Sequence, residues 1–135
     1  MDAADLVPIP LFASLSQRQR QELARKMDVV DLPAGRVLTD EGVLAYEFLV
    51  IVDGTATVSH GSRHIRNLGA GDFIGEIGLL QDQQRRTATV VTTSPVRALV
   101  MSGPEFRALV RDQPEIADAV RATMQQRIAA DADSG

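Results

Sequence analysis

The chain has 135 residues and a mass of 14.6 kDa, which predicts a single domain spanning residues 1–135. Its 44% hydrophobic and 24% charged residues are typical of a folded globular protein rather than a disordered one. The absence of cysteine excludes a disulfide scaffold, a thiolate metal site and cysteine catalysis. The net charge of −4 argues against direct nucleic-acid binding, because such binding depends on neutralising phosphates with basic side chains.

The sequence shows no targeting or membrane signal. The N-terminus is acidic and lacks the basic region and apolar stretch of a signal peptide. No apolar run approaches the roughly 20 residues that a membrane-spanning helix needs. We therefore expect a cytoplasmic protein with no membrane segment.

The first segment, about residues 10–28, is expected to be helical. Ser16 followed by Gln19 fits a capping box, so the main helix should begin there. Its apolar residues recur at helical spacing and form one stripe: Phe12, Leu15, Leu23, Ala24 and Met27.

The middle segment, about residues 29–101, is expected to consist of strands and turns. The apolar, β-branched run Phe48–Val52 leads to Asp53-Gly54, a pair typical of a tight hairpin turn. Thr55–Ser59 then alternates apolar and hydroxyl residues, as a half-buried strand does.

Further short strands follow in the same segment. Gly61-Ser62 predicts a second turn, and the remaining strand candidates are Arg63–Leu68, Thr87–Thr92 and Val96–Met101. Several short strands at this spacing favour a sandwich or a small barrel.

The C-terminal segment, about residues 103–131, returns to helix. Ser102, Pro104 and Glu105 offer an N-cap, an early proline and a reciprocal glutamate, and Asp112–Glu115 repeats that pattern. The last helix carries an apolar stripe at every fourth residue: Ile116, Val120, Met124 and Ile128. Residues 131–135 are expected to be a short polar tail.

One stretch, from Gly69 to Val90, breaks the strand pattern. Its many glycines suit a backbone that passes close to a ligand. A loop entering one helical turn at Glu76–Leu80 would present free N–H groups to an anion. Arg85 and Arg86 follow, and a guanidinium matches phosphate oxygens in bidentate fashion.

Two more side chains refine the expected ligand. Thr87 adds a hydroxyl donor beside the arginines, whereas the Glu76 carboxylate would repel a phosphate. Glu76 makes sense if it accepts hydrogen bonds from a neutral hydroxyl of the same ligand. The pattern therefore predicts a ligand with a phosphate at one end and a sugar hydroxyl nearby.

Two common phosphate-binding motifs are excluded. The stretch has no Gly-Lys-Ser/Thr sequence, so it is not a P-loop. Gly69, Gly71 and Gly75 miss the dinucleotide-binding spacing by one residue, and the strands do not alternate with long helices.

Gly75-Glu76-Ile77-Gly78-Leu79-Leu80, followed by Arg86-Thr87-Ala88-Thr89-Val90, resembles the phosphate-binding cassette of cyclic nucleotide-binding domains. That family includes the catabolite activator protein, protein kinase A regulatory subunits and cyclic nucleotide-gated channels. The resemblance extends over nearly the whole chain. It implies a mainly β fold: an eight-stranded antiparallel jelly roll, or double-stranded β-helix, with an N-terminal helical segment, a short cassette helix and C-terminal helices.

The resemblance also implies roles for single residues. Glu76 matches the glutamate that binds the ribose 2′-hydroxyl, and Arg86 matches the arginine that binds the cyclic phosphate. Thr87 matches an additional phosphate or purine contact of some members. The implied ligand-binding set is Gly75, Glu76, Ile77, Gly78, Leu79, Arg85, Arg86, Thr87 and Ala88. Many members have proline where this chain has Arg85; the spacing to Thr87-Ala88 favours Arg86 as the inward arginine.

The resemblance implies a non-catalytic sensor for a 3′,5′-cyclic nucleotide, cAMP first and cGMP second, with no cofactor and no metal. His60 and His64 flank a turn, where they are expected to be exposed and to lack a third metal ligand. The alternative is a protein-interaction module on the same jelly roll, with an empty pocket or a different small ligand.

The output of the sensor stays open at this point. A protein partner or a homodimer through the C-terminal helix is expected, and the stripe from Ile116 to Ile128 fits a lid, a dimer face or core packing equally well. Helix–turn–helix, kinase and channel segments are absent, so the chain is either a stand-alone module or a piece of a larger regulator.

Overall fold

The structure is a computed structural model that describes residues 6, 9–39, 47–74 and 88–134, with the backbone alone for residues 39 and 127–134. Its helices are η2 (Pro10–Phe12, a 3₁₀ turn), α1 (Gln17–Ala24), α3 (Gly103–Asp112) and α4 (Pro114–Ser134). Its strands are β1 (Asp28–Leu32), β2 (Val37–Thr39), β3 (Glu47–Asp53), β4 (Ala56–His60), β5 (Arg63–Leu68), β6 (Phe73–Ile74), β7 (Thr89–Thr92) and β8 (Val96–Ser102).

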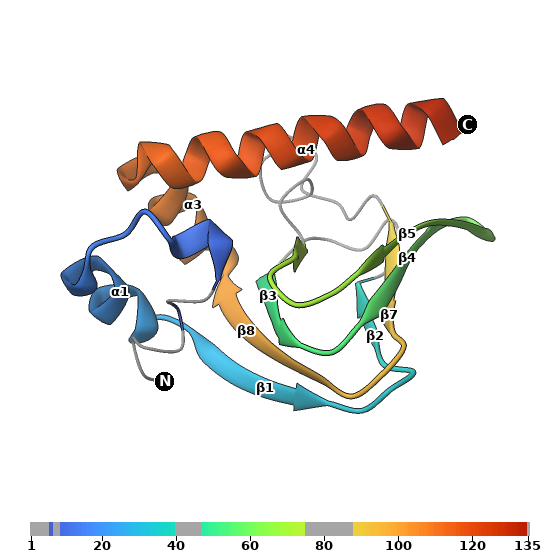
Figure 1. The fold of residues 1–135 in the computed structure, drawn as a ribbon, viewed down its shortest axis with the longest axis horizontal. Coiled ribbons are helices and arrows are strands. Elements are labelled where there is room, and N and C mark those ends of the chain that lie inside the picture. The colour runs from blue at the N-terminus through green and yellow to red at the C-terminus, as the bar shows by residue number, and fades with distance from the viewer. Residues whose placement is uncertain (1–5, 7–8, 40–46, 75–87, 135) are drawn as a thin grey trace.

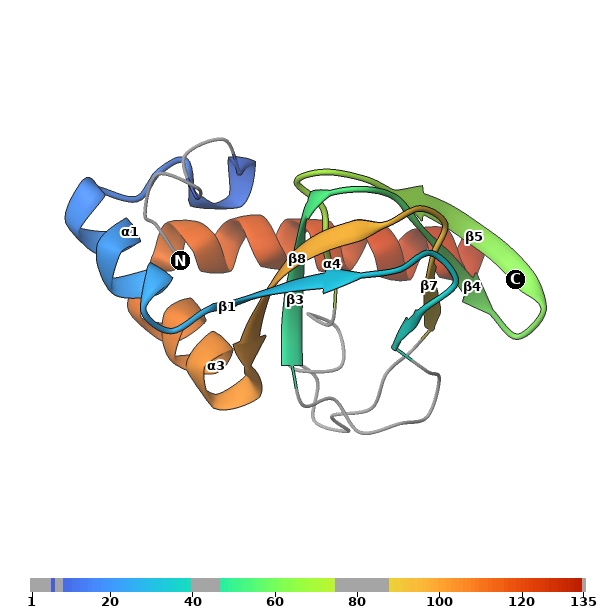
Figure 2. The same ribbon diagram turned by 90° about the horizontal axis from the view of Figure 1, so that it is seen from below.

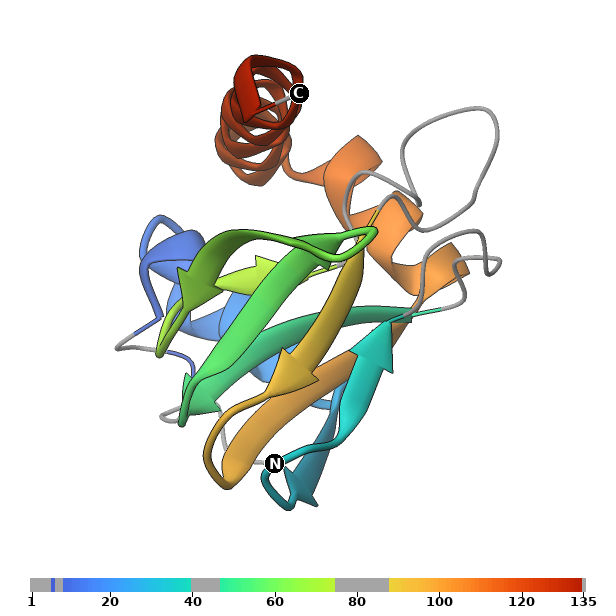
Figure 3. The same cartoon turned by 90° about the vertical axis from the view of Figure 1, so that its right-hand side faces the viewer.

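The strands form two four-stranded antiparallel sheets. The first sheet has the order β1-β8-β3-β6 and the second β2-β7-β4-β5. The helices lie at one end of this roll, and α4 extends along its side (Figures 1 and 2). Figure 3 shows the second sheet from the end opposite α1. The prediction of a mainly β fold with flanking helices is confirmed.

The first sheet separates two hydrophobic cores. One face packs on the helices, and its core contains Phe12, Leu23, Phe48, Val50, Phe73, Leu99, Met101, Phe106, Ile116 and Val120. The other face lines the interior of the roll with Leu49, Ile51, Ala56, Val58, Leu68, Ile74, Val90, Val96 and Ala98. We call these the helical core and the roll core. Because both faces of β3 are covered, its apolar run does not alternate with polar residues.

The Asp53-Gly54 turn is present, but the prediction of a hairpin there is wrong. β3 pairs with β8 and β6, whereas β4 pairs with β5 and β7, so the turn passes from one sheet to the other. A second corner, between β7 and β8, packs against it. The Thr93 amide donates to the Thr55 carbonyl oxygen (2.9 Å), and the Thr55 amide donates to Ser94 Oγ (2.9 Å).

The other turns and strands lie close to the positions predicted from the sequence. Gly61 adopts a φ of +63° in the β4–β5 hairpin, as predicted. The strand predicted from residue 87 is observed as β7 from Thr89, and Ser102 extends β8 by one residue beyond the predicted end.

The N-terminal helix begins as predicted. The Gln19 amide donates to Ser16 Oγ (3.1 Å), and the Ser16 amide donates to Gln19 Oε1 (2.8 Å), which completes the capping box. The stripe residues Phe12, Leu15, Leu23, Ala24 and Met27 are all buried.

The C-terminal helices depart from the prediction in three ways. Ser102 caps α3 by accepting from the Glu105 amide (3.3 Å), but α3 lacks the reciprocal bond that would complete a capping box. α3 runs through Asp112, so Gln113 occupies the position before α4. The helix α4 continues to Ser134, because nothing after Pro114 breaks it, and the predicted polar tail is therefore helical.

The apolar stripe of α4 begins as core. Ile116 and Val120 are fully buried in the helical core, where α4 packs on α3 and η2, and Met124 is half-buried. These first two residues of the stripe are therefore part of the core. The side chain of Ile128 lies outside the described residues.

The corner at Gly54 yields a stability prediction. Gly54 has a φ of +103°, and a Cβ there would overlap the carbonyl oxygen of Pro95 and lie 2.8 Å from Val96 Cγ2. Gly35 also has a positive φ, +82°, but a Cβ there would meet nothing within 4 Å. We expect Gly54→Ala to reduce the free energy of unfolding by about 2–5 kcal/mol and Gly35→Ala by about 1 kcal/mol, measured by urea denaturation. Equal losses of unfolding free energy in the two variants would contradict the close packing of the β3–β4 turn against the β7–β8 turn.

Candidate functional site

The predicted ligand-binding residues lie almost entirely outside the described part of the chain. Gly75, Glu76, Ile77, Gly78, Leu79, Arg85, Arg86 and Thr87 fall in residues 75–87, which we call the cassette segment. Ala88 is described: it is half-buried, sits at the bend before β7 and packs against the roll core. The structure also describes the residues directly before and after the cassette segment.

A fixed turn precedes the cassette segment. Gly71, at a φ of +91°, donates its amide to the Ile51 carbonyl oxygen (2.8 Å), and the Ile51 amide donates to the Asp72 carbonyl oxygen (2.8 Å). The Asp72 carboxylate Oδ2 accepts from the Gly69 amide (2.8 Å). These bonds hold the turn against β3 and place β6 antiparallel to it. Gly71 and Asp72 are therefore turn residues.

The two residues of β6 divide between the two cores. Phe73 pairs with Val50 and faces the helical core, whereas Ile74 pairs with Leu49 and faces the roll core. The residue directly before the cassette segment is therefore buried inside the roll.

The chain after the cassette segment belongs to the other sheet. In β7, Thr89 pairs with Ser59 and Val90 with Val58 of β4. Val90 is buried in the same roll core as Ile74. The cassette segment thus connects strands of the two sheets, and Ile74 and Val90, which flank it in the sequence, both lie in the roll core.

The two histidines lie where the sequence analysis expected them. His60 and His64 are exposed, and His64 Nε2 lies 2.8 Å from Asn67 Oδ1. The described residues contain no group of three or more histidine, aspartate or glutamate side chains that could hold a metal ion.

One exposed ion pair ties the first sheet together. Arg97 Nε donates to Asp31 Oδ1 (2.9 Å), and its terminal nitrogen donates to Asp31 Oδ2 (3.3 Å). The hydrogen bond and charge of Arg97 hold the pKa of Asp31 below its ordinary value. The pair joins β1 to β8 at directly opposed register positions, so we assign it a structural role.

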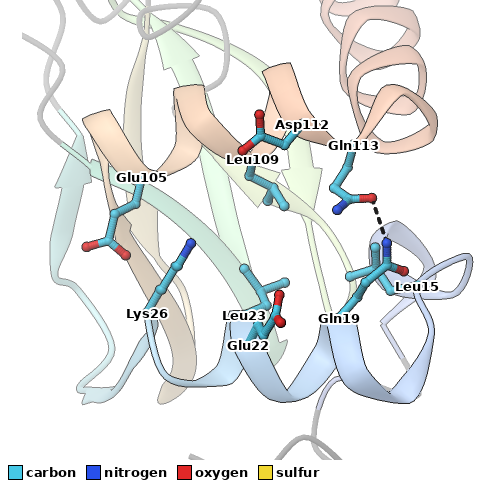
Figure 4. A pocket seen from close by; sticks show the side chains of 9 residues that line it. All are labelled: Leu15, Gln19, Glu22, Leu23, Lys26, Glu105, Leu109, Asp112 and Gln113. Atoms are coloured by element: carbon cyan, nitrogen blue, oxygen red, sulfur yellow. Dashed lines mark hydrogen bonds between the residues drawn. The ribbon is translucent and has the colours of Figure 1, made fainter.

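Sequence reasoning missed a groove between α1 and α3. It is lined by Leu15, Gln19, Glu22, Leu23, Lys26, Glu105, Leu109, Asp112 and Gln113 (Figure 4). The residues come from helices about 90 positions apart in the sequence, and only the tertiary fold brings them together. No short sequence motif predicts such a groove.

The comparison with known proteins decides the family. The profile of the cyclic nucleotide-binding domain matches residues 29–113 of the chain. This chain belongs to the cyclic nucleotide-binding domain family. The resemblance inferred from the cassette motif is therefore confirmed.

Individual relatives agree with this assignment. A cyclic nucleotide-gated potassium channel of Rhizobium etli is 34% identical over 119 residues, covering 88% of this chain and 33% of the channel. A cGMP-dependent protein kinase of Eimeria tenella is 35% identical over 85 residues, covering 63% of this chain and 8% of the kinase. The chain thus spans about a third or less of the length of these two relatives.

The fold also matches solved structures. A cAMP-bound protein kinase A regulatory subunit, PfPKA-R, superposes with a TM-score of 0.86 at 20% identity, covering 95% of this chain and 44% of that one. This similarity shows the jelly-roll fold expected of a cyclic nucleotide-binding domain. Within the described residues, no helix combines the length and the apolar character that a membrane crossing requires.

The turn before the cassette segment yields a second prediction. Asp72→Ala removes the acceptor of the Gly69 amide and should lower the free energy of unfolding by about 1 kcal/mol. Asp72→Asn keeps a side-chain oxygen and should lose less than half as much. Hydrogen exchange at the Gly69 amide should accelerate in the alanine variant only. Equal exchange in both variants would show that the carboxylate does not hold the turn.

Proposed function

We propose that this cyclic nucleotide-binding domain is a non-catalytic sensor that binds cAMP, with cGMP as the alternative ligand, and regulates a partner in the cytoplasm. The observation that carries the proposal is the cassette motif, which stands between two strand ends that border the roll core. A cAMP-bound structural relative and a cGMP-dependent kinase relative support the two ligands.

In this proposal the cyclic phosphate binds at the start of the cassette segment and at Arg86. The backbone amides of Gly75, Ile77 and Gly78 donate to its oxygens, and the Arg86 guanidinium supplies charge-assisted hydrogen bonds. Leu79 follows in the same turn. Arg85 raises the local positive potential and attracts the anion.

The ribose and base bind beside the phosphate. Glu76 accepts a hydrogen bond from the 2′-hydroxyl, which a carboxylate does better than a neutral acceptor. Thr87 donates its hydroxyl to the phosphate or the purine. Ala88, half-buried against the roll core, limits the depth of the site.

Three aromatic rings offer a route from the site to the helices. Phe73, two residues before the cassette segment, has its ring 5.6 Å from that of Phe48. Phe48 in turn stacks on Phe106 of α3 at 4.1 Å. We propose that nucleotide binding shifts β6 and, through these rings, the position of α3 and α4. A ligand shifts such an equilibrium only by its differential affinity for the two states.

The binding site is tested by titrating cAMP, then cGMP, into protein stripped of nucleotide by unfolding and refolding. Arg86→Ala should weaken binding at least about tenfold, because hydrogen bonds to a charged group contribute about 1.5–3 kcal/mol. Arg63→Ala is the matched control, since it removes the same charge from the exposed β4–β5 hairpin and should leave the affinity unchanged.

Unchanged affinity in Arg86→Ala would refute the assigned phosphate contact. Absence of heat and of a melting shift with both nucleotides, in refolded protein of normal secondary structure, would favour an interaction module with an empty pocket.

The aromatic route is tested separately by hydrogen exchange along α4 with and without saturating cAMP. In the wild-type chain the exchange of α4 amides should change on binding. Phe106→Leu, which keeps an apolar core residue but removes the stacked ring, should bind cAMP and show a smaller change. Val110→Ala, a buried substitution on the same helix, is the control and should retain the full change. Equal changes in α4 hydrogen exchange in all three proteins would exclude the aromatic route.

A further inference from the structure

One arginine occupies the face of the second sheet that lines the interior of the roll. Arg66 of β5 pairs directly with Val58 of β4, and Val58 pairs with Val90 of β7. Residues paired directly across antiparallel strands project from the same face of a sheet, and both valines lie in the roll core. Leu68, two residues after Arg66 and hence on the same face, also lies in the roll core. The register therefore places Arg66 on the interior face.

The Arg66 side chain is only partly covered by the protein. The residue is half-buried, and its Nε atom is buried. β5 is the last strand of the second sheet, so no further strand of that sheet lies beyond it. The two terminal nitrogens of a guanidinium extend past Nε and carry most of its N–H donors. Arg66 can thus offer donors to a ligand inside the roll while its stem stays packed.

The charged and titratable side chains on the strands of the second sheet are all basic. β2, β4, β5 and β7 contain His60, Arg63, His64 and Arg66, but no aspartate or glutamate. Arg63 and the two histidines are exposed near the β4–β5 turn, whereas Arg66 shares a row with residues of the roll core. The interior edge of this sheet therefore suits a group that is rich in hydrogen-bond acceptors.

Arg66 also lies within reach of a nucleotide bound at the cassette segment. β4 is the single strand between β5 and β7, so the row from Arg66 to Val90 spans about 10 Å at roughly 4.8 Å per strand. Val90 is the third residue after the cassette segment. A nucleotide held there by its phosphate and ribose has only its base left to extend along this row toward Arg66.

We propose that Arg66 recognises the base of the bound nucleotide and gives the site a preference for guanine over adenine. This inference rests on the nucleotide site proposed above and reverses the order of its two ligands. Guanine presents two neighbouring acceptors, O6 and N7, which match two N–H donors of one guanidinium. Adenine presents N7 beside an amino group, so the same guanidinium would meet one donor with another.

The test compares three cyclic nucleotides by isothermal titration into protein stripped of nucleotide: cGMP, cAMP and inosine 3′,5′-cyclic monophosphate (cIMP). cIMP carries the O6 and N7 acceptors of guanine but lacks its 2-amino group, so it isolates the base edge that Arg66 would contact. We expect cGMP and cIMP to bind at least about tenfold tighter than cAMP. A cIMP affinity equal to that of cAMP would overturn the proposal, because the 2-amino group would then carry any preference for guanine.

Two substitutions at the same position separate base recognition from folding. Arg66→Ala should weaken cGMP and cIMP binding about tenfold and leave cAMP binding within about twofold. Arg66→Gln should favour cAMP, because a glutamine amide matches the amino group and N7 of adenine. An inverted preference cannot arise from partial unfolding, which weakens the binding of all three nucleotides together.

Arg63→Ala is the matched control, since it removes the same charge from the exposed end of β5 and should keep the wild-type order of affinities. Binding of all three nucleotides in an order that neither Arg66 substitution changes would overturn the role of Arg66 and leave the sensor function standing. The arginine would then only cover the roll core with its aliphatic stem. Absence of binding of all three nucleotides to the refolded wild-type chain would overturn the nucleotide site itself, and base recognition with it.

Discussion

The structure depends on β3 being buried on both of its faces. Val50 and Phe48 face the helices, Leu49 and Ile51 face the interior of the roll, and β8 and β6 occupy the two edges of the strand. A strand in this position cannot move or be repacked on one side without consequence for the other. The helical core and the roll core are therefore not independent units but share one wall.

That shared wall gives the cassette segment its context. The segment begins directly after β6, whose two residues face opposite cores, and ends before β7 in the other sheet. The helices begin just as directly, because Ser102 is both the last residue of β8 and the cap of α3. The roll core and the packing of the helices are consequently separated by one layer of backbone.

The sequence predicted what short-range chemistry determines. The Ser16–Gln19 capping box and the turn at Gly61 follow from residues close together in the sequence, and both are present. The hairpin at Asp53-Gly54 failed because a turn signal specifies the turn but not which strands pair after it. The groove beside Glu105 was beyond prediction, since the same residues also encode a complete capping box. The cassette was found from its motif, and its geometry remains the subject of the proposal.

The most direct test of the account is methyl NMR of the chain, stripped of nucleotide, during addition of cAMP. Ile74 and Val90 border the cassette segment from opposite sheets and share the roll core. We predict that their methyl signals shift together and saturably, while the signals of Val29 and Val37, which are 45% and 48% exposed on the outer faces, stay in place. Shifts confined to outer residues, or no shift at Ile74 and Val90 at saturating cAMP, would contradict a cyclic nucleotide site between the two sheets.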